Sequence, residues 1–234
     1  MLKRFRIVGL CLAAVFAMSA VATSSASAAP VWQQCGAGTE FTNSLCTTSG
    51  SGPFGWVEVA TKVAVTSEGR LTLTSSTGTE LECPESTEAV GKDEGFIGPS
   101  SADEITKITD SAGKAVVKCK IVKAGSPACS APATATAVHL PWITKLILVG
   151  TEIRDEIVSG TGGAPGYETK CGNGLSLTCT GATSTAVTNN TVTGNVELTF
   201  EAKSAATSCG LGITGKVKGT DTILHPAGGA IRVH

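Results

Sequence analysis

Apolar and polar residues alternate one by one in several segments of this chain, and no other sequence feature constrains its fold as strongly. In segment 196–203 every second residue is Val, Leu, Phe or Ala, and Glu, Thr or Lys stand between them. Segment 57–65 has Val57, Val59, Val63 and Val65 on one face. A period of two places one face of a strand in the core and the other in water. Beyond residue 28, no window repeats apolar residues at helical spacing. The pattern predicts an all-β protein.

Shorter segments of the same type recur, separated by Gly- and Asn-containing pairs such as Asn173-Gly174 that favour turns. Many short strands at this spacing predict a β-sandwich, with a barrel as the alternative, and residues 29–234 fit one such domain. The predicted strands are Arg70–Ser75, Thr79–Cys83, Glu104–Thr109, Val116–Val122, Ala133–Leu140, Trp142–Val149, Glu152–Val158, Tyr167–Cys171, Leu175–Cys179, Ile213–Lys218 and Ala230–Val233.

Three segments differ from this regular pattern. Glu85–Asp103 lacks periodicity and is predicted to be a long surface loop, while Trp142–Val149 is apolar on both faces, as in a central strand that is covered on both sides. Gly69–Thr74, followed by Cys83, resembles Gly194–Thr199, followed by Cys209. This similarity indicates either two similar β units or two unrelated strands that share an ordinary strand composition.

The first 28 residues have the organisation of a secretory signal peptide. Lys3, Arg4 and Arg6 precede an apolar run, and Ala26-Ser27-Ala28 forms an A-x-A site, so we expect cleavage after Ala28. A retained membrane anchor is the alternative, but a run of about 15 residues is shorter than the roughly 20 that span a bilayer. Loss of these three cations makes the formal net charge of −1 three units more negative. The mature chain has no basic stripe, which argues against nucleic acid as a partner.

Cysteines supply the second constraint. The chain has nine cysteines, and one of them, Cys11, lies in the signal region. The even number that remains predicts a set of disulfides, because an exported chain meets an oxidising environment. Proximity favours three short loops, Cys35–Cys46, Cys119–Cys129 and Cys171–Cys179, and leaves Cys83–Cys209 as a long-range bond. No C-x-x-C pair or nearby His pair indicates zinc, and we expect neither a metal nor a cofactor. The eight cysteines expected in disulfides are Cys35, Cys46, Cys83, Cys119, Cys129, Cys171, Cys179 and Cys209.

Catalytic patterns are scarce, and we assign no catalytic residue. The acidic cluster Glu152-Ile-Arg-Asp155-Glu156 places Glu152, Arg154 and Glu156 on one face of a strand, where the glutamates could serve a glycosidase or form a solvated surface. Asp93-Glu94 and Asp103-Glu104 bracket the predicted loop and could offer oxygen ligands to calcium, but they match no calcium-loop spacing, so solvated charge is the simpler interpretation.

Aromatic residues are few, which makes each of them informative. Trp142 and Tyr167, together with Trp56, could form a flat surface on which sugar rings stack. They could equally fill the core, because aromatic side chains bury large apolar areas. We single out Trp142 and Tyr167 as candidate binding residues.

The order of these features resembles that of a group of exported proteins from high-GC Gram-positive bacteria. The resemblance rests on the signal peptide, the Gly-x-Leu-x-Leu strand, Glu-Leu-Glu-Cys83, Asp-Glu-Ile-Thr-Lys-Ile108, Cys119 with Cys129, His139-Leu-Pro-Trp142, Gly162-Gly-Ala-Pro-Gly-Tyr167 and Cys171. It implies a secreted bacterial β protein and assigns no activity.

These features together predict a secreted, disulfide-stapled all-β protein, free in the medium or loosely associated with the cell envelope. We expect a non-enzymatic binding or structural role at the cell surface, and the partner could be a cell-wall or extracellular glycan or a protein. The alternative is a secreted carbohydrate-active hydrolase. No membrane span is expected in the mature chain.

Overall fold

A computed structural model describes residues 29–86, 91–99, 103–201, 206–226 and 229–234. Within these ranges the chain forms β-strands and turns and no α-helix, which confirms the predicted all-β class. No helix in the described ranges is long and apolar enough to span a membrane. The predicted signal peptide 1–28, its cleavage site after Ala28, and Cys11 lie outside the described residues.

Seventeen strands are present in the described part of the chain. Their bounds are β1 Trp32–Phe41, β2 Phe54–Glu58, β3 Val63–Ser75, β4 Thr79–Cys83, β5 Gly91–Ile97, β6 Asp103–Thr109, β7 Val116–Ala124, β8 Ala133–Val138, β9 Trp142–Val149, β10 Glu152–Val158, β11 Gly166–Lys170, β12 Ser176–Thr180, β13 Thr183–Asn190, β14 Asn195–Phe200, β15 Ala206–Ser208, β16 Thr214–Leu224 and β17 Ile231–Val233.

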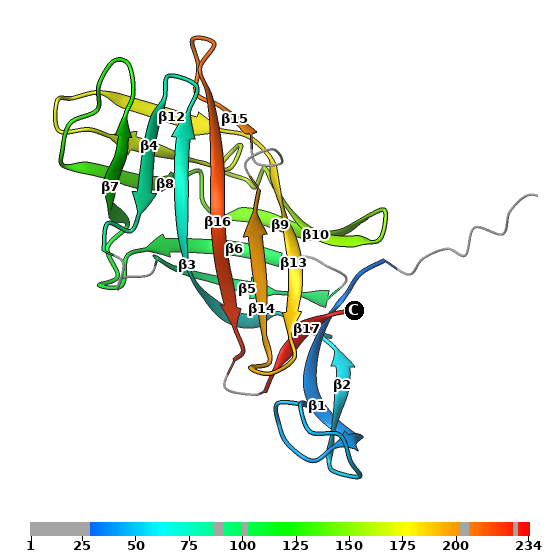
Figure 1. The fold of residues 1–234 in the computed structure, drawn as a ribbon. Helices are drawn as coiled ribbons and strands as arrows, with labels where there is room; N and C mark the ends of the chain where they lie inside the picture. Colours follow the sequence, from blue (N-terminus) through cyan, green and yellow to red (C-terminus); the bar gives the residue numbers. More distant parts are fainter. Residues whose placement is uncertain (1–28, 87–90, 100–102, 202–205, 227–228) are drawn as a thin grey trace, which may run out of the picture.

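Three of these strands form a small separate sheet, in the order β17-β1-β2, which projects from one end of the larger body (Figure 1). Trp32 at the start of β1 is buried in the main core, and its indole N–H donates a hydrogen bond to the Asp103 carboxylate on β6. The Asn189 side chain on β13 bonds both backbone groups of Val233, at 2.7 Å each. These contacts attach the small sheet firmly to the body.

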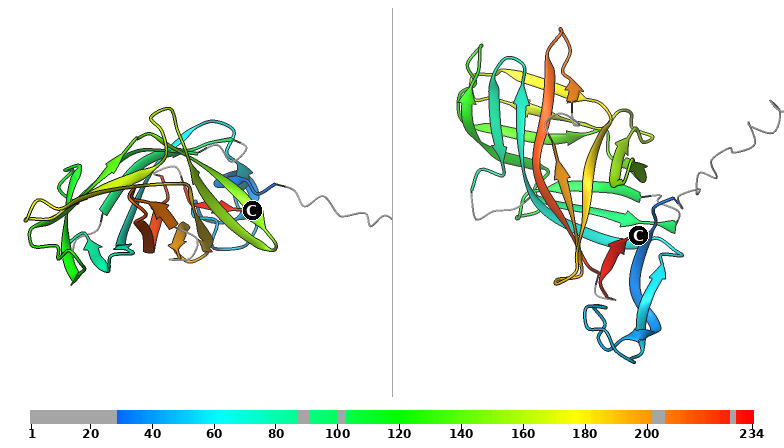
Figure 2. Two further views of the ribbon diagram at one scale, coloured as in Figure 1. Left: turned by 90° about the horizontal axis from the view of Figure 1, so that it is seen from above. Right: turned by 45° about the vertical axis from the view of Figure 1, so that its right-hand side comes forward.

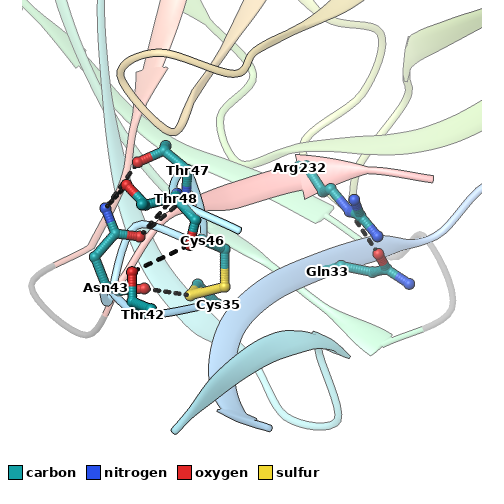
Figure 3. The surroundings of a disulfide bond; sticks show 8 residues. All are labelled: Gln33, Cys35, Thr42, Asn43, Cys46, Thr47, Thr48 and Arg232. Carbon is teal, nitrogen blue, oxygen red and sulfur yellow. Dashed lines mark hydrogen bonds between the residues drawn. A yellow bond between two sulfur atoms is a disulfide. The ribbon is translucent and has the colours of Figure 1, made fainter. Parts of the chain in front are cut away.

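The outer loop of the small sheet is closed by the Cys35–Cys46 disulfide, whose pairing was predicted from proximity. Asn43 organises this loop (Figure 3): its Oδ1 accepts the backbone N–H of Thr47 at 3.0 Å and its Nδ2 donates to the Thr47 hydroxyl at 2.8 Å. A short side chain that bonds its own backbone in this way stabilises a turn. The protruding loop therefore has a defined conformation.

The other fourteen strands pair in an antiparallel, closed order. The longest two, β3 and β16, pair from Thr66 with Leu224 to Ser75 with Gly215, and Figure 1 and the right-hand view of Figure 2 show them side by side over most of their length. Each of these strands has a different outer neighbour at each end: β3 pairs with β5 and then β4, whereas β16 pairs with β15 and then β14. The β3–β16 ribbon is consequently shared by two circuits of strands.

We name these circuits by their contents. The acid circuit runs β3-β5-β6-β9-β10-β13-β14-β16, and the disulfide circuit runs β3-β4-β7-β8-β11-β12-β15-β16. Between the shared strands the chain alternates between them, with the hairpins β5–β6, β9–β10 and β13–β14 in one circuit and β7–β8 and β11–β12 in the other. The two circuits are thus interleaved along the sequence.

This interleaving does not match a duplication of sequence halves. Gly69–Thr74 lies in β3, which both circuits share, whereas Gly194–Thr199 spans the turn before β14 and most of β14, which belongs to the acid circuit alone. Both segments flank β16 on opposite edges, so they do not occupy equivalent places. The similarity of the two segments therefore does not extend to their positions in the fold.

All eight cysteines of the described chain are paired, but three of the four predicted pairings are wrong. The bonds are Cys83–Cys119, Cys129–Cys171 and Cys179–Cys209, with sequence separations of 36, 42 and 30 residues. Strand register explains the difference.

Across the β7–β8 hairpin Cys119 faces Ala133, and across β11–β12 Cys179 faces Tyr167. The cysteine expected from sequence proximity therefore does not stand opposite either of them. Disulfides need Cβ atoms about 4 Å apart, and the register of Glu82 with Lys120 brings Cys83 and Cys119 to the same level of β4 and β7. All three bonds belong to the disulfide circuit and its strand ends, where they join β4 to β7, β8 to β11 and β12 to β15.

The predicted register of segment 196–203 is correct within β14: Val196, Leu198 and Phe200 are all buried, and Glu197 is exposed. Ala202 and Lys203 lie outside the described residues. The predicted strand 57–65 is instead two strands, because β2 ends at Glu58 in the small sheet and β3 begins at Val63 in the body. The alternating pattern continues through the connection between them, so periodicity alone could not locate this break.

Two further predictions are corrected by strand pairing. The segment Glu85–Asp103 contains β5, which pairs with both β3 and β6. Strand β9 lies between β6 and β10, but only one of its faces is covered: Leu146 is buried, whereas Ile143 and Val149 are 37% and 52% exposed. Its second apolar face meets solvent.

Candidate functional site

The main body contains a partly open apolar cavity of about 140 Å³ where the two circuits meet beneath the shared β3–β16 ribbon. The acid circuit contributes Ile157, Leu198 and Phe200, and the disulfide circuit contributes Val117 and Ala135, all of which are buried. These side chains face inward because each occupies an inward position in the alternating pattern of its strand. The cavity is therefore built by both circuits and belongs to neither alone.

Both aromatic residues that we singled out from the sequence line this cavity. Trp142 at the start of β9 donates its indole N–H to the Val138 carbonyl at 2.7 Å, which fixes the ring at the cavity wall. Tyr167 on β11 reaches the cavity from the disulfide circuit.

Trp56, the third ring of the predicted stacking surface, lies in the small sheet instead. There the Arg232 guanidinium stands 4.4 Å from the centre of its ring. The three rings do not form one flat surface, and two of them line an interior space.

Two residues of the lining, Tyr167 and Thr207, carry hydroxyl groups that are buried within the wall without hydrogen bonds of ordinary geometry. Among the described residues, neither the Tyr167 hydroxyl nor the Thr207 Oγ1 has such a partner. Thr207 on β15 is only 6% exposed. Burial raises the pKa of Tyr167 to about 12, although the nearby Thr207 hydroxyl opposes the rise. Both groups consequently remain protonated donors over the physiological pH range.

Two carboxyl groups, Asp93 on β5 and Asp221 on β16, also line the cavity. Burial raises the pKa of Asp93 well above its usual value, and the charge of Asp221 raises it further. Burial likewise raises the pKa of Asp221 to about 6, although Ser67 donates a hydrogen bond to its Oδ2 at 2.6 Å. No Lys, Arg or His belongs to the cavity lining formed by the described residues. The lining thus offers no positive charge to an anion.

A second pair of buried carboxyls, Asp103 and Asp155, lines a smaller pocket of the acid circuit together with Asp93 and Asp221. Burial raises the pKa of Asp103 to about 7 against hydrogen bonds from Trp32, the Gly98 N–H and Thr144. Asp155 on β10 is 3% exposed, and burial together with the charge of Asp103 raises its pKa to about 8. Its Oδ1 has no hydrogen-bond partner among the described residues. This pair is a source of pH-dependent stability.

The glutamates of the predicted acidic cluster lie on the outer face of β10, as the alternation indicated. Glu152 pairs with Arg154 at 2.8 Å, and Glu156 pairs with Lys145 at 3.1 Å. Neither glutamate lines this cavity or the two neighbouring pockets lined by Trp32 and by His225. Asp155 occupies the opposite face, so the sequence cluster is divided between the surface and the interior.

The same division recurs in the other two Asp-Glu pairs. Asp93 and Asp103 point into the acid circuit, whereas Glu94 bonds Lys107 and Glu104 bonds Lys62 at the surface, at 2.8 Å each. The interpretation of these pairs as solvated loop charge is wrong for Asp103, which is 6% exposed and lies on a strand.

No group of three or more acidic, His or Cys side chains within the described ranges could hold a metal ion. The sequence analysis missed Thr207 and the inward aspartates as interior residues. The available signal was alternation: Asp155 stands between Ile153 and Ile157, which both pack in the core.

Comparisons with protein-family models, with curated proteins and with solved structures find no match to this chain. The resemblance to exported proteins of high-GC Gram-positive bacteria stays a prediction.

Proposed function

We propose that this chain is an exported, non-enzymatic binding protein that holds a small neutral apolar molecule in the cavity between its two circuits. The observation that carries the proposal is the cavity itself. It lies inside a disulfide-stapled body and is lined by apolar side chains together with Trp142 and Tyr167. An apolar cavity of about 150 Å³ is large enough to bind benzene, so a space of about 140 Å³ fits a compact ring.

The charge of the lining supports a neutral ligand. An anion would meet the carboxyl groups of Asp93 and Asp221 without a compensating cation. A neutral apolar molecule avoids this cost, and its transfer from water is favourable in proportion to the area buried.

Several observations favour binding over the alternative of carbohydrate hydrolysis. A glycosidase needs two carboxyl groups flanking the scissile bond, at roughly 5–10 Å from one another. The two outward glutamates of the sequence cluster, Glu152 and Glu156, are each neutralised in a surface ion pair and do not line the cavity between the circuits. The place of action, in the medium or at the cell envelope, follows from the predicted signal peptide and is supported by the four disulfides.

Filling the cavity tests the binding role directly. Methylenecyclohexane is a suitable apolar probe, and its binding to the purified mature protein can be followed by titration calorimetry. Ala135→Leu places extra methyl groups in the cavity, so this variant should lose probe binding at least tenfold while its melting temperature stays the same or rises. Thr134→Leu adds similar volume at a neighbouring position of β8 that does not line the cavity, and should bind normally. Equal binding by both variants, or no binding by the wild type, contradicts the proposed site.

Export is tested by the mature protein itself. Protein recovered from the medium of an expressing bacterium should begin at Ala29, and mass spectrometry under denaturing, non-reducing conditions should find no free thiol. Protein that still carries residues 1–28 argues against cleavage of a signal peptide. Two or more reactive thiols argue against a complete set of disulfides.

A further inference from the structure

We propose that the outer face of strands β16, β3, β4 and β7 binds the phosphate groups of a flexible polyol-phosphate polymer of the cell envelope. These four strands pair in this order, and Figure 1 shows them side by side. Leu73, Val117 and Val217 on their inner face line the cavity, so the opposite face is turned to solvent. This binding surface is independent of what the cavity holds.

Strand register arranges the outer face in two rows of the same composition. In each row a lysine of β16 and a lysine of β7 stand at the edges, with a threonine of β3 and a glutamate of β4 between them. The residues are Lys216, Thr74, Glu80 and Lys123 in one row, and Lys218, Thr72, Glu82 and Lys120 in the other. Paired strands lie about 4.8 Å apart, and alternate residues of a strand about 6.8 Å apart. The four lysines therefore stand at the corners of a grid of about 14 Å by 7 Å.

The lysines of this face differ from those of the acid circuit in their partners. Lys92 on β5, Lys107 on β6 and Lys145 on β9 each form an ion pair with a glutamate. Within the described part of the chain, no ion pair is formed by the exposed lysines of β7 and β16, which are Lys118, Lys120, Lys123, Lys216 and Lys218. Glu82, one of the two glutamates in the rows, is already bound to Arg70 at 2.9 Å. Positive charge is therefore in excess on this face, although the whole chain has a formal net charge of −1.

The face is held rigid from beneath. Cys119 lies between Lys118 and Lys120 on β7 and is bonded to Cys83 on β4. This disulfide fixes β7 against β4, and β4 continues through β3 to β16 in unbroken register. A partner therefore meets lysines whose backbone positions are preset, and only their side chains have to be ordered on binding.

The composition of the face indicates the chemistry of its partner. A lysine ammonium is a point charge that attracts phosphate from many directions, whereas an arginine fits planar groups in a fixed geometry. Arg70, the arginine of these strands, is already paired with a carboxylate. Lysines spread over a grid therefore suit repeated phosphates on a flexible chain. The hydroxyls of Thr72 and Thr74 lie between the lysines and can bond the hydroxyl groups of a polyol.

Nucleic acid also carries phosphates, but this face lacks the groups that bind its bases. Strands β3, β4, β7 and β16 contain no aromatic residue, so bases have no ring on which to stack. A slim polyol chain brings its phosphates close to a flat face, whereas unstacked bases hold a nucleic acid strand away from it. The polyol phosphate is therefore the better match.

The test measures binding of a fluorescently labelled oligo(glycerol phosphate) to the purified mature protein by fluorescence polarisation. Lys120→Gln combined with Lys218→Gln removes one lysine from each edge of the face. This double variant should bind about tenfold more weakly and depend less steeply on salt, because each lost phosphate contact lowers the salt slope by about one. Lys107→Gln combined with Lys145→Gln is the matched control, since it removes the same charge from the acid circuit and should bind as the wild type does.

The outcomes decide both the surface and its partner. Equal losses in the two double variants, or no loss in either, overturn the proposed surface. Failure of the wild type to bind, or an affinity that does not fall as salt rises, overturns it without any variant and leaves the cavity proposal untouched. Single-stranded DNA with the same number of phosphates should bind more weakly than the oligo(glycerol phosphate). Equal or tighter binding of the DNA overturns the assignment to a polyol phosphate.

Discussion

Asp155 gives the sharpest test of the interior of the acid circuit. Its carboxyl is buried beside Asp103, and burial raises its pKa to about 8. Because the folded pKa lies above that of the unfolded chain, the folded state holds a proton that the unfolded state has lost between about pH 4 and pH 8. The stability that this group contributes is therefore fully present below about pH 4 and is lost as the pH rises through about 8.

The magnitude follows from the number of protons. One proton bound only in the folded state lowers the free energy of unfolding by about 1.4 kcal/mol per pH unit, or about 3 kcal/mol between about pH 5 and pH 7. Asp155→Asn removes this contribution and should be more stable than the wild type at about pH 7.5 by a few kcal/mol. Its advantage should vanish or reverse below about pH 3, where the wild-type carboxyl is protonated in both states.

Urea unfolding followed by tryptophan fluorescence at several pH values measures this slope. Glu156→Gln is the matched control, because Glu156 is adjacent in sequence but lies on the outer face in an ion pair with Lys145. Exposed pairs contribute about 0–1 kcal/mol, so the control should keep the wild-type slope. Equal slopes for Asp155→Asn and the wild type would refute a proton on Asp155 in the folded protein at neutral pH.

Three further outcomes are expected. Leu198→Ala should lower the free energy of unfolding by about 2–5 kcal/mol because its side chain is buried, whereas Thr199→Ala should change it little, and urea unfolding of both checks the register of β14. Non-reducing peptide mapping should join Cys83 to Cys119, and a bond from Cys119 to any other cysteine contradicts the strand order. Trp32→Phe removes the indole donor to a buried carboxyl and should cost about 1–3 kcal/mol in urea unfolding, with no loss expected if the small sheet is independent.

Local sequence patterns predicted most strands because their cause is local. β4, β9 and β10 have the predicted bounds, and the inward side of β14 is correct. Alternation fails where an inward position carries a polar residue or glycine. The β5 sequence Gly-Lys-Asp-Glu-Gly-Phe-Ile places Asp93 and Gly95 where apolar residues are expected, so the segment reads as a loop. Pairing with β3 and β6 makes it a strand nevertheless.

The candidate site was predicted in part. Trp142 and Tyr167 were identified because large aromatic residues are rare in this chain, but their neighbours were not. Thr207 lies outside the predicted strands, and its place beside Tyr167 depends on β15 pairing with β12, which is 26 or more residues earlier in the chain. A single strand cannot indicate which distant strand will be its neighbour.

The amino-acid sequence by itself determined the all-β class, the presence of a disulfide framework and the inward side of its regular strands, because all three depend on residue type and on spacing within a few positions. Tertiary structure alone decided how the strands are ordered. The chain alternates between two circuits that share β3 and β16, and this order sets which cysteines meet and encloses a cavity between the circuits. It also brings Asp103 and Asp155 together from strands on either side of β9. Such contacts arise from the mutual burial of distant segments, for which no local pattern carries a signal.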